Sequence, residues 1–157
     1  MLNLHTLTKT FPGGLVALKD IDLTIRENEV VSIVGPSGCG KSTLLKIIAG
    51  LDAEYGGALT RRQRTDGSPS IGLIFQEPRL MPWLTVVDNA AFGLRAPGHR
   101  RREVAMAWLR RVGLADFADA LPRALSGGMA QRVSIARALA PGPDVLLLDE
   151  PFSAVDA

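Results

Sequence analysis

The chain lacks the features that mark several classes of protein. Cysteine occurs once, at Cys39, so no disulfide can form within the chain, and a reducing compartment is the simplest interpretation. The formal net charge of +2 is too small to indicate a nucleic-acid partner. No apolar run approaches the roughly 18 residues that span a bilayer, and the first residues lack the basic start and apolar core of a signal peptide. Any membrane association would therefore come through a partner protein.

The overall composition is that of an ordinary globular protein, and the chain is long enough for one domain with a hydrophobic core. Strands are expected where short apolar or alternating runs occur, at 2–7, 15–25, 58–60, 71–75 and 145–148. Helices are expected where apolar residues recur every three or four positions, after Thr85, at 102–112 and after Ser126. The first two strands should pair in antiparallel fashion, and the unbroken last run predicts burial on both faces. This order predicts an α/β core with a helical insertion.

The most informative stretch is residues 35–43, which fits the phosphate-loop pattern G-x-x-x-x-G-K-[ST]. The apolar run at 30–34 predicts a buried strand before it, and residues 44–49 predict a helix that ends at Gly50. Backbone N–H groups at a helix start, which have no intrahelical acceptor and at glycines are not shielded by a side chain, attract a polyanion. The predicted nucleotide ligands are Gly35, Pro36, Ser37, Gly38, Cys39, Gly40, Lys41, Ser42 and Thr43. A glycine-rich turn without a ligand is the alternative.

Lys41 and Ser42 have specific predicted roles in this loop. Lys41 would reach the outer phosphates and assist catalysis, and the Ser42 hydroxyl would ligate Mg²⁺. Asp149 and Glu150 follow the strand at 145–148, where open α/β sheets bind ligands. Asp149 would hold Mg²⁺, and Glu150 would polarise the attacking water. A solvated acidic pair at a strand end is the alternative.

Gln76 also follows an expected strand. Its amide could ligate Mg²⁺ or sense the attacking water, although strand-end glutamines are often merely exposed.

The segment 125–139, LSGGMAQRVSIARAL, carries a resemblance to a family. It resembles the signature of the nucleotide-binding subunits of ATP-binding cassette (ABC) transporters, and the order of phosphate loop, Gln76, signature and Asp149-Glu150 matches as well. Met129 departs from the glutamine that many members carry. The resemblance implies a P-loop NTPase (RecA-like) core at 1–81 and 124–157, with an N-terminal antiparallel β subdomain. It also implies a helical subdomain at 82–123.

The resemblance implies ATP and Mg²⁺ as cofactors and a second nucleotide-binding subunit as partner. In a head-to-tail dimer, the signature of one chain would cap the γ-phosphate held by the other chain's phosphate loop. The signature residues so assigned are Ser126, Gly127, Gly128 and Gln131. Phe11 stands where the family places an aromatic that stacks on adenine, with core packing as the alternative. Residues 153–156 resemble the family's D-loop at the dimer interface.

Residues 76–85 resemble the importer branch that handles nitrate, sulfonates and taurine. The implied assembly adds membrane-spanning permease subunits and, indirectly, a periplasmic substrate-binding protein. The resemblance places this subunit at the cytoplasmic face of the inner membrane as a peripheral protein. No nucleic-acid partner is expected. Trp83 would then be a docking residue, or it would be buried under the helical block.

The chain ends at Ala157, seven residues past Glu150. The resemblance implies a further strand and a switch histidine beyond that point, and neither His5 nor His99 matches that histidine. We therefore expect a C-terminally truncated chain that is poorly stable and nearly inactive. Two alternatives remain: a non-catalytic nucleotide-binding remnant, and a non-transport ABC ATPase acting on DNA or ribosomes.

Overall fold

The computed structural model describes residues 1–61 and 71–150. The chain falls into two compact units, Met1–Gln63 and Arg64–Ala157, which are described separately. The D-loop-like residues 153–156 lie outside the described part.

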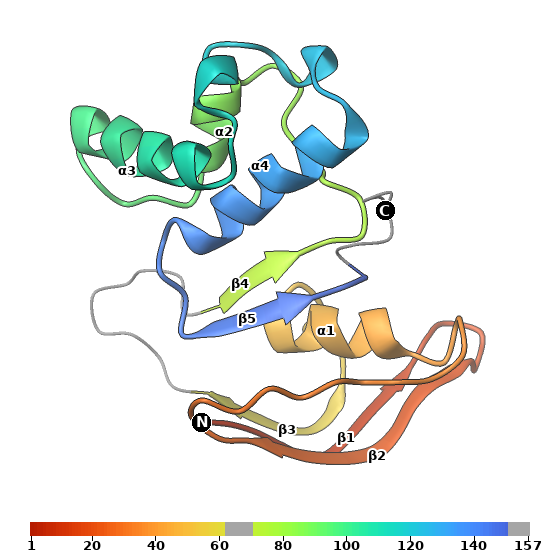
Figure 1. The fold of residues 1–157 in the computed structure, drawn as a ribbon. Helices are drawn as coiled ribbons and strands as arrows, with labels where there is room; N and C mark the ends of the chain where they lie inside the picture. The colour runs from red at the N-terminus through yellow and green to blue at the C-terminus, as the bar shows by residue number, and fades with distance from the viewer. Residues whose placement is uncertain (62–70, 151–157) are drawn as a thin grey trace. The chain divides into compact units, whose positions relative to one another are not determined.

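Unit 1 is a three-stranded antiparallel sheet with one helix. Its strands are β1 (Leu2–Thr10), β2 (Val16–Ile25) and β3 (Gly56–Arg61), in the spatial order β2-β1-β3. Helix α1 (Lys41–Ala49) lies across one face of this sheet (Figure 1). The predicted antiparallel pair is confirmed, and so is the helix end at Gly50, which adopts a left-handed conformation.

The buried face of β1 carries Leu2, Leu4 and Leu7, and α1 buries Ile47 and Ile48. Two irregular positions interrupt the β1–β2 register between Leu4 and Lys9. Lys9 follows Leu7 on the buried face, where the alternation favours an apolar side chain.

The buried strand predicted at 30–34 is wrong for this structure. These residues form no strand, and the side chains of Val30 and Val34 are 94% and 92% exposed. A strand is stabilised by a neighbour that satisfies its backbone and covers its side chains. Among the described residues, no strand pairs with this segment. The apolar run is therefore present without the surface that would bury it.

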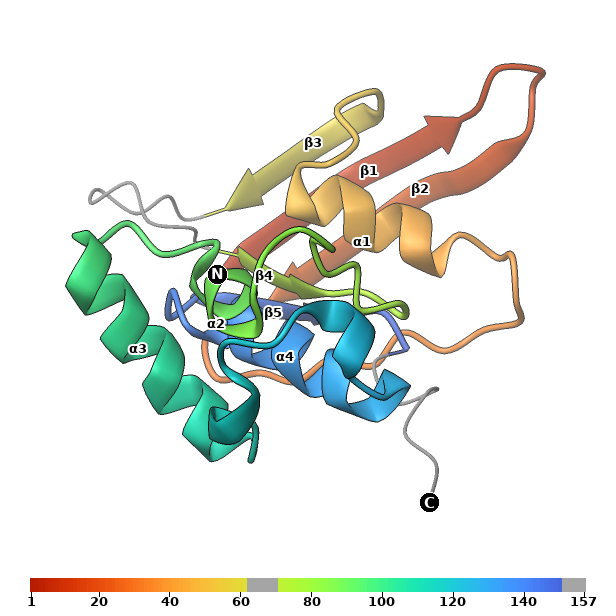
Figure 2. The ribbon, with the colours of Figure 1, turned by 90° about the horizontal axis from the view of Figure 1, so that it is seen from above.

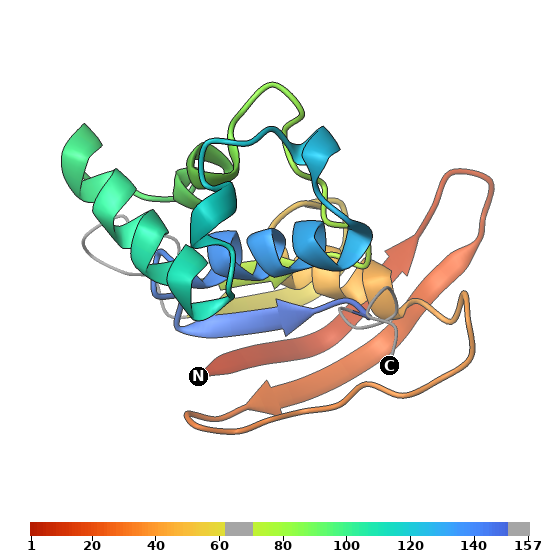
Figure 3. The same ribbon diagram turned by 45° about the horizontal axis from the view of Figure 1, so that its top comes forward.

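Unit 2 contains a two-stranded parallel sheet of β4 (Ile71–Ile74) and β5 (Val145–Leu148), with Ile74 paired to Leu148. Helix α4 (Gly127–Leu139) lies across one face of this pair (Figure 1, Figure 3). The prediction that residues 145–148 are buried on both faces is wrong. Leu147 is buried, whereas Leu146 and Leu148 are exposed, because the helical layer covers only one face.

The rest of unit 2 is helical. Helices α2 (Val86–Ala91) and α3 (Gly98–Arg111) pack beside α4 (Figure 2), and short 3₁₀ turns lie at Ala115–Phe117 and Pro122–Ala124. The shared core is made of aliphatic and small residues from all three helices and the loop after α3: Val86, Val87, Ala90, Ala91, Ala105, Leu109, Leu114, Ala118, Val133 and Ala136.

Local capping explains two of these helix starts. The Thr85 hydroxyl oxygen accepts from the Asp88 backbone N–H at 3.2 Å, which confirms the predicted start of α2. Helix α3 begins at Gly98, four residues before the predicted 102. Pro97 is the N-cap, and its carbonyl oxygen accepts from the Arg101 backbone N–H at 2.9 Å, which forms the first turn of the helix. The basic run at 100–102 is thus inside the helix rather than ahead of it.

Candidate functional site

The phosphate loop of unit 1 depends on the conformation of Gly40. Gly40 has a φ of 99°, in the left-handed region, and starts α1. A Cβ on Gly40 would lie 2.4 Å from the Ala17 carbonyl oxygen and 3.0 Å from Leu18 Cδ2. Only glycine fits there without moving the backbone. The end of the phosphate loop therefore packs directly against strand β2.

The loop itself is open to solvent. Residues 35–39 are exposed, as is Ser42, while Lys41 and Thr43 are half-buried. The first turn of α1 contains no acidic residue, so the partial positive charge of the helix start is not compensated. This combination favours an anionic ligand.

Lys41 closes the loop on itself. Its Nζ donates to the carbonyl oxygens of Gly35 and Pro36, both at 2.8 Å. These bonds hold the Lys41 ammonium against the backbone of the loop. A phosphate oxygen would compete for the same donors, and a charged acceptor makes the stronger bond.

Unit 2 brings together the residues predicted at its strand ends. The Asp149 N–H donates to the Ile74 carbonyl oxygen at 2.9 Å, which extends the β4–β5 pairing by one step. Just beyond, Gln76 Nε2 donates to Glu150 Oε2 at 3.4 Å. Glu150 has a φ of 46°, so the backbone turns there and the two exposed side chains meet.

The donor set predicted for Mg²⁺ suits that ion chemically. It consists of a hydroxyl, an amide oxygen and a carboxylate, from Ser42 in unit 1 and from Gln76 and Asp149 in unit 2. Hard oxygen donors of this kind suit Mg²⁺, which binds few protein ligands and keeps waters or phosphate oxygens in its shell. Within residues 1–61 and 71–150, no group of three or more His, Cys, Asp or Glu side chains is placed to hold a metal ion.

The start of α4 is a second exposed, glycine-rich helix N-terminus. Ser126 is the N-cap, and its Oγ accepts from the Met129 N–H at 3.2 Å. Ser126 and Gly127 are exposed, Gly128 is half-buried, and no acidic residue lies in the first turn. A Cβ on Gly127 or Gly128 would meet no atom within 4 Å, and neither glycine has a positive φ. The chain's own packing therefore does not require either glycine.

Gln131 differs from the other predicted signature residues, Ser126 to Gly128, because it does not lie at the exposed start of α4. Its side chain is fully buried, and Nε2 donates to the Phe75 carbonyl oxygen at 3.1 Å. Arg137, two turns further along, donates to the carbonyl oxygens of Pro78 at 2.7 Å and Arg79 at 2.9 Å. Both side chains thus hold the segment that contains Gln76. Burial lowers the pKa of the Arg137 guanidinium.

The sequence interpretation missed Arg137. Its position on α4 identifies a helical residue, but its acceptors lie more than fifty residues away and have no motif of their own.

The aromatic side chains singled out in the sequence are accessible. Phe11 is 36% exposed in the β1–β2 turn, which is closed by hydrogen bonds from Phe11 N–H to the Leu15 carbonyl and from Gly14 N–H to the Phe11 carbonyl. Trp83 is 75% exposed, so of its two predicted environments the structure has the exposed one. None of the helices in the described part of the chain combines the length and apolar character needed to cross a membrane.

Comparison with known proteins identifies the family. The model of the ABC transporter family matches residues 18–153, which include the phosphate loop, the signature and the acidic pair. The chain belongs to the ABC transporter family. The predicted resemblance and the predicted phosphate-loop fold class are thereby confirmed.

Among similar proteins, the chain is 55% identical over 157 residues to the aliphatic sulfonates import ATP-binding protein SsuB 1 of Pseudomonas savastanoi pv. phaseolicola, covering 100% of this chain and 63% of that protein. It is 52% identical over 159 residues to SsuB 2 of Burkholderia cenocepacia, covering 100% of this chain and 58% of that protein. The chain thus spans about 60% of the length of these relatives.

A similar fold occurs in a solved dimeric structure of the ATP-binding cassette MJ0796 in a post-hydrolysis state bound to ADP and Pi. The TM-score is 0.85 at 40% identity, and the match covers 100% of this chain and 77% of that one.

Proposed function

We propose that this chain binds and hydrolyses ATP as the nucleotide-binding subunit of an ABC importer of the nitrate, sulfonate and taurine type. The observation that carries the proposal is the pair of exposed, glycine-rich helix starts at 35–43 and 126–128, each without acidic compensation. The similar proteins of Pseudomonas savastanoi and Burkholderia cenocepacia are named for the import of aliphatic sulfonates, which supports the substrate class.

In this proposal the phosphate loop holds the triphosphate through its backbone N–H groups, and Lys41 shifts its donors from the Gly35 and Pro36 carbonyls to the outer phosphates. Ser42, Gln76 and Asp149 would hold Mg²⁺, which when bound neutralises charge on the phosphate oxygens. Glu150 orients and polarises the attacking water, and Gln76, within 3.4 Å of the Glu150 carboxylate, senses that water.

The start of α4 serves a second chain. Ser126, Gly127 and Gly128 offer a hydroxyl and backbone N–H groups at the helix start, and the space where a Cβ would lie is open at both glycines. They would contact the γ-phosphate held by a partner copy, so that ATP joins a head-to-tail dimer. A dimeric cassette among the similar structures supports this arrangement. We assign Gln131 to positioning of the Gln76 segment instead of nucleotide contact, because its side chain is buried.

The importer assembly requires further partners. Permease subunits at the cytoplasmic face of the membrane would receive the exposed Trp83 and the segment 76–85, and a periplasmic substrate-binding protein would act on those permeases. A second candidate function, nucleotide binding without turnover, is favoured by the exposed apolar segment at 30–34, which borders the phosphate loop.

The decisive experiment measures ATP binding and phosphate release on the same preparations. Lys41→Ala should weaken ATP binding, whereas Glu150→Gln should leave binding within about twofold and lower turnover by about 10²- to 10⁴-fold. Glu77→Gln, an exposed carboxylate beside Gln76, is the matched control and should change neither. ATP binding without turnover in the unmodified chain would favour the second candidate, and undiminished turnover in Glu150→Gln would contradict the assigned base.

The substrate class has its own test. A bacterium that lacks its sulfonate-importer ATP-binding subunit should regain growth on an alkanesulfonate as sole sulfur source when this chain is supplied. Failure of growth in a chain that hydrolyses ATP would reject the sulfonate assignment and leave the ATPase assignment intact.

A further inference from the structure

Lys9 is a charged residue on the buried face of a strand. The register of β1 is irregular between Leu4 and Leu7, so Leu7 and Lys9 are buried as Leu2 and Leu4 are, and only 4% of the Lys9 surface is exposed. A lysine in such a position costs free energy unless its ammonium has partners.

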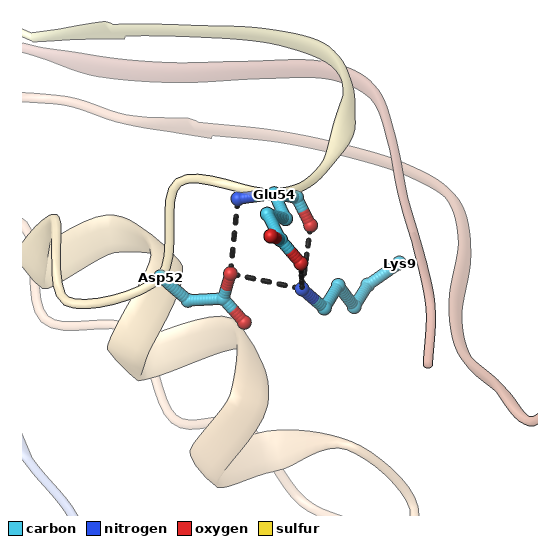
Figure 4. Close-up of polar contacts among 3 residues, drawn as sticks. All are labelled: Lys9, Asp52 and Glu54. Carbon is cyan, nitrogen blue, oxygen red and sulfur yellow. Dashed lines mark hydrogen bonds and ion pairs between the residues drawn. The ribbon is translucent and has the colours of Figure 1, made fainter. Parts of the chain in front are cut away.

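The partners of Lys9 come from the segment that follows α1 (Figure 4). Nζ donates to Asp52 Oδ1 at 2.9 Å and to the Glu54 carbonyl oxygen at 2.6 Å, and the Glu54 carboxylate lies 3.9 Å away. Asp52 Oδ1 also accepts from the Glu54 backbone N–H at 3.0 Å, so the three residues form one closed network. The Lys9 hydrogen bond, and then the bond from Glu54, lower the pKa of the Asp52 carboxyl, because both stabilise its ionised form. The ammonium is therefore held firmly in place.

The same ammonium lies over the ring of Phe11, with Nζ 5.2 Å from the ring centroid. That distance is within the range in which a cation is attracted to the ring face. Phe11 is also partly exposed, so the ring has a covered and an accessible part. A cation near one side of a phenyl ring draws electron density toward itself, which favours stacking of an electron-rich base on the accessible side.

Lys9 is connected to the phosphate loop by two routes within unit 1. In the β1–β2 register Lys9 pairs with Leu18, whose side chain, with the Ala17 carbonyl, lies directly against Gly40. Through Asp52 and Glu54, Lys9 also holds the segment just after α1, the helix that starts at the phosphate loop. The Lys9 side chain thus contacts both the aromatic residue and the segment that follows the phosphate-loop helix.

We propose that Lys9 is a positioning residue for the nucleotide base, which holds the Phe11 ring at a set place relative to the phosphate loop and polarises it for stacking on adenine. The proposal rests on the proposed ATP-binding function. Lys9 itself does not contact the triphosphate. Its effect reaches the nucleotide only through Phe11, so it should depend on the presence of the base.

The test compares ATP with tripolyphosphate, which has the phosphates but no base. Dissociation constants for both are measured on the unmodified chain and on Lys9→Gln, which keeps an amide for Asp52 but no charge over the ring. We expect ATP binding to weaken about tenfold while tripolyphosphate binding stays within about twofold. Lys19→Gln, an exposed lysine on β2, is the matched control and should change neither value.

A double-variant comparison identifies the route. In a Phe11→Ala background, Lys9→Gln should cause no further loss of ATP affinity, because the ring through which it acts is gone. Lys9→Arg, which keeps a charge near the ring, should recover part of the lost affinity. Asp52→Asn leaves Lys9 present but weakens its hold, and it should lower the ratio of ATP to tripolyphosphate affinity in the same direction. This variant carries the test if Lys9→Gln does not fold.

The proposal would be overturned if Lys9→Gln weakened ATP and tripolyphosphate binding equally, or left the ratio of their affinities unchanged. Additive losses of ATP affinity in the double variant would overturn it as well. Lys9 would then be a purely structural ion-pair residue. Failure of the proposed function looks different. In that case the unmodified chain binds neither ATP nor tripolyphosphate, whatever residue stands at position 9.

Discussion

The guanidinium of Arg137 lies 2.7 Å from the carbonyl oxygen of Pro78, and the same group reaches the Arg79 carbonyl at 2.9 Å. Arg79 itself has a φ of 44°, and its guanidinium lies 4.5 Å from the Phe75 ring centroid. Helix α4 therefore holds a turn of unusual backbone conformation just after Gln76. Arg137 lies in the last turn of α4, the helix whose N-terminus Ser126 caps.

Arg137→Met should destabilise the chain, because it removes both charge-assisted hydrogen bonds and leaves two carbonyl groups without those donors. We expect a loss of about 2–4 kcal/mol in the free energy of unfolding, measured by urea denaturation. Arg110→Met, an exposed position on α3, is the control and should stay within about 0.5 kcal/mol. An unchanged free energy of unfolding in Arg137→Met would show that the turn after Gln76 keeps its shape without the Arg137 guanidinium.

Gly128→Ala separates the folding of α4 from its proposed contact with a partner. The added Cβ has open space around it, and alanine favours a helix over glycine by about 1 kcal/mol, so the melting temperature should stay the same or rise. ATP-dependent dimerisation, measured by size-exclusion chromatography in a Glu150→Gln background, should fall. Unchanged dimerisation would contradict the proposed capping of the partner's phosphate by this N-terminus.

Gly40→Ala, unlike Gly128→Ala, should lower the stability of the chain. Its Cβ would lie 2.4 Å from the Ala17 carbonyl oxygen, in a backbone conformation that L side chains rarely adopt, so the loop must move. We expect a loss of about 1–3 kcal/mol in stability together with weaker binding of ATP and of tripolyphosphate. Gly38→Ala, also left-handed but with open space, is the comparison and should cost less. Equal costs at both positions would show that strain, and not contact with β2, decides.

The Lys9–Asp52 ion pair should make stability depend on acid pH. The pKa of Asp52 is lowered in the folded state, so its contribution is present above the unfolded value of 3.8 and is lost as the pH falls through the lower folded value. Asp52→Asn should therefore melt below the unmodified chain at pH 7. The two melting temperatures should converge as the pH falls below about 3.8, as measured by thermal scans from pH 7 to pH 2.5. A difference that stays constant over this range would assign the effect to packing instead of charge.

Local signals in the sequence account for most of the correct predictions. Thr85 and Asp88 identify the start of α2, because the cap is completed within four residues. Gly50 ends α1 for an equally local reason, its left-handed conformation. The run at 30–34 was predicted wrongly from the same kind of signal. Its β-branched residues favour a strand, but a strand forms only beside a partner, and none is present among the described residues.

The sequence by itself determined the family, the phosphate loop, the signature and the acidic pair, because each is a short run whose chemistry lies in consecutive residues. Only the tertiary structure decided what Lys9, Gln131 and Arg137 do. Each of these side chains donates a hydrogen bond to an atom more than forty residues away in the chain. A buried polar group must find its partner in space, and no local pattern in the sequence records where that partner lies.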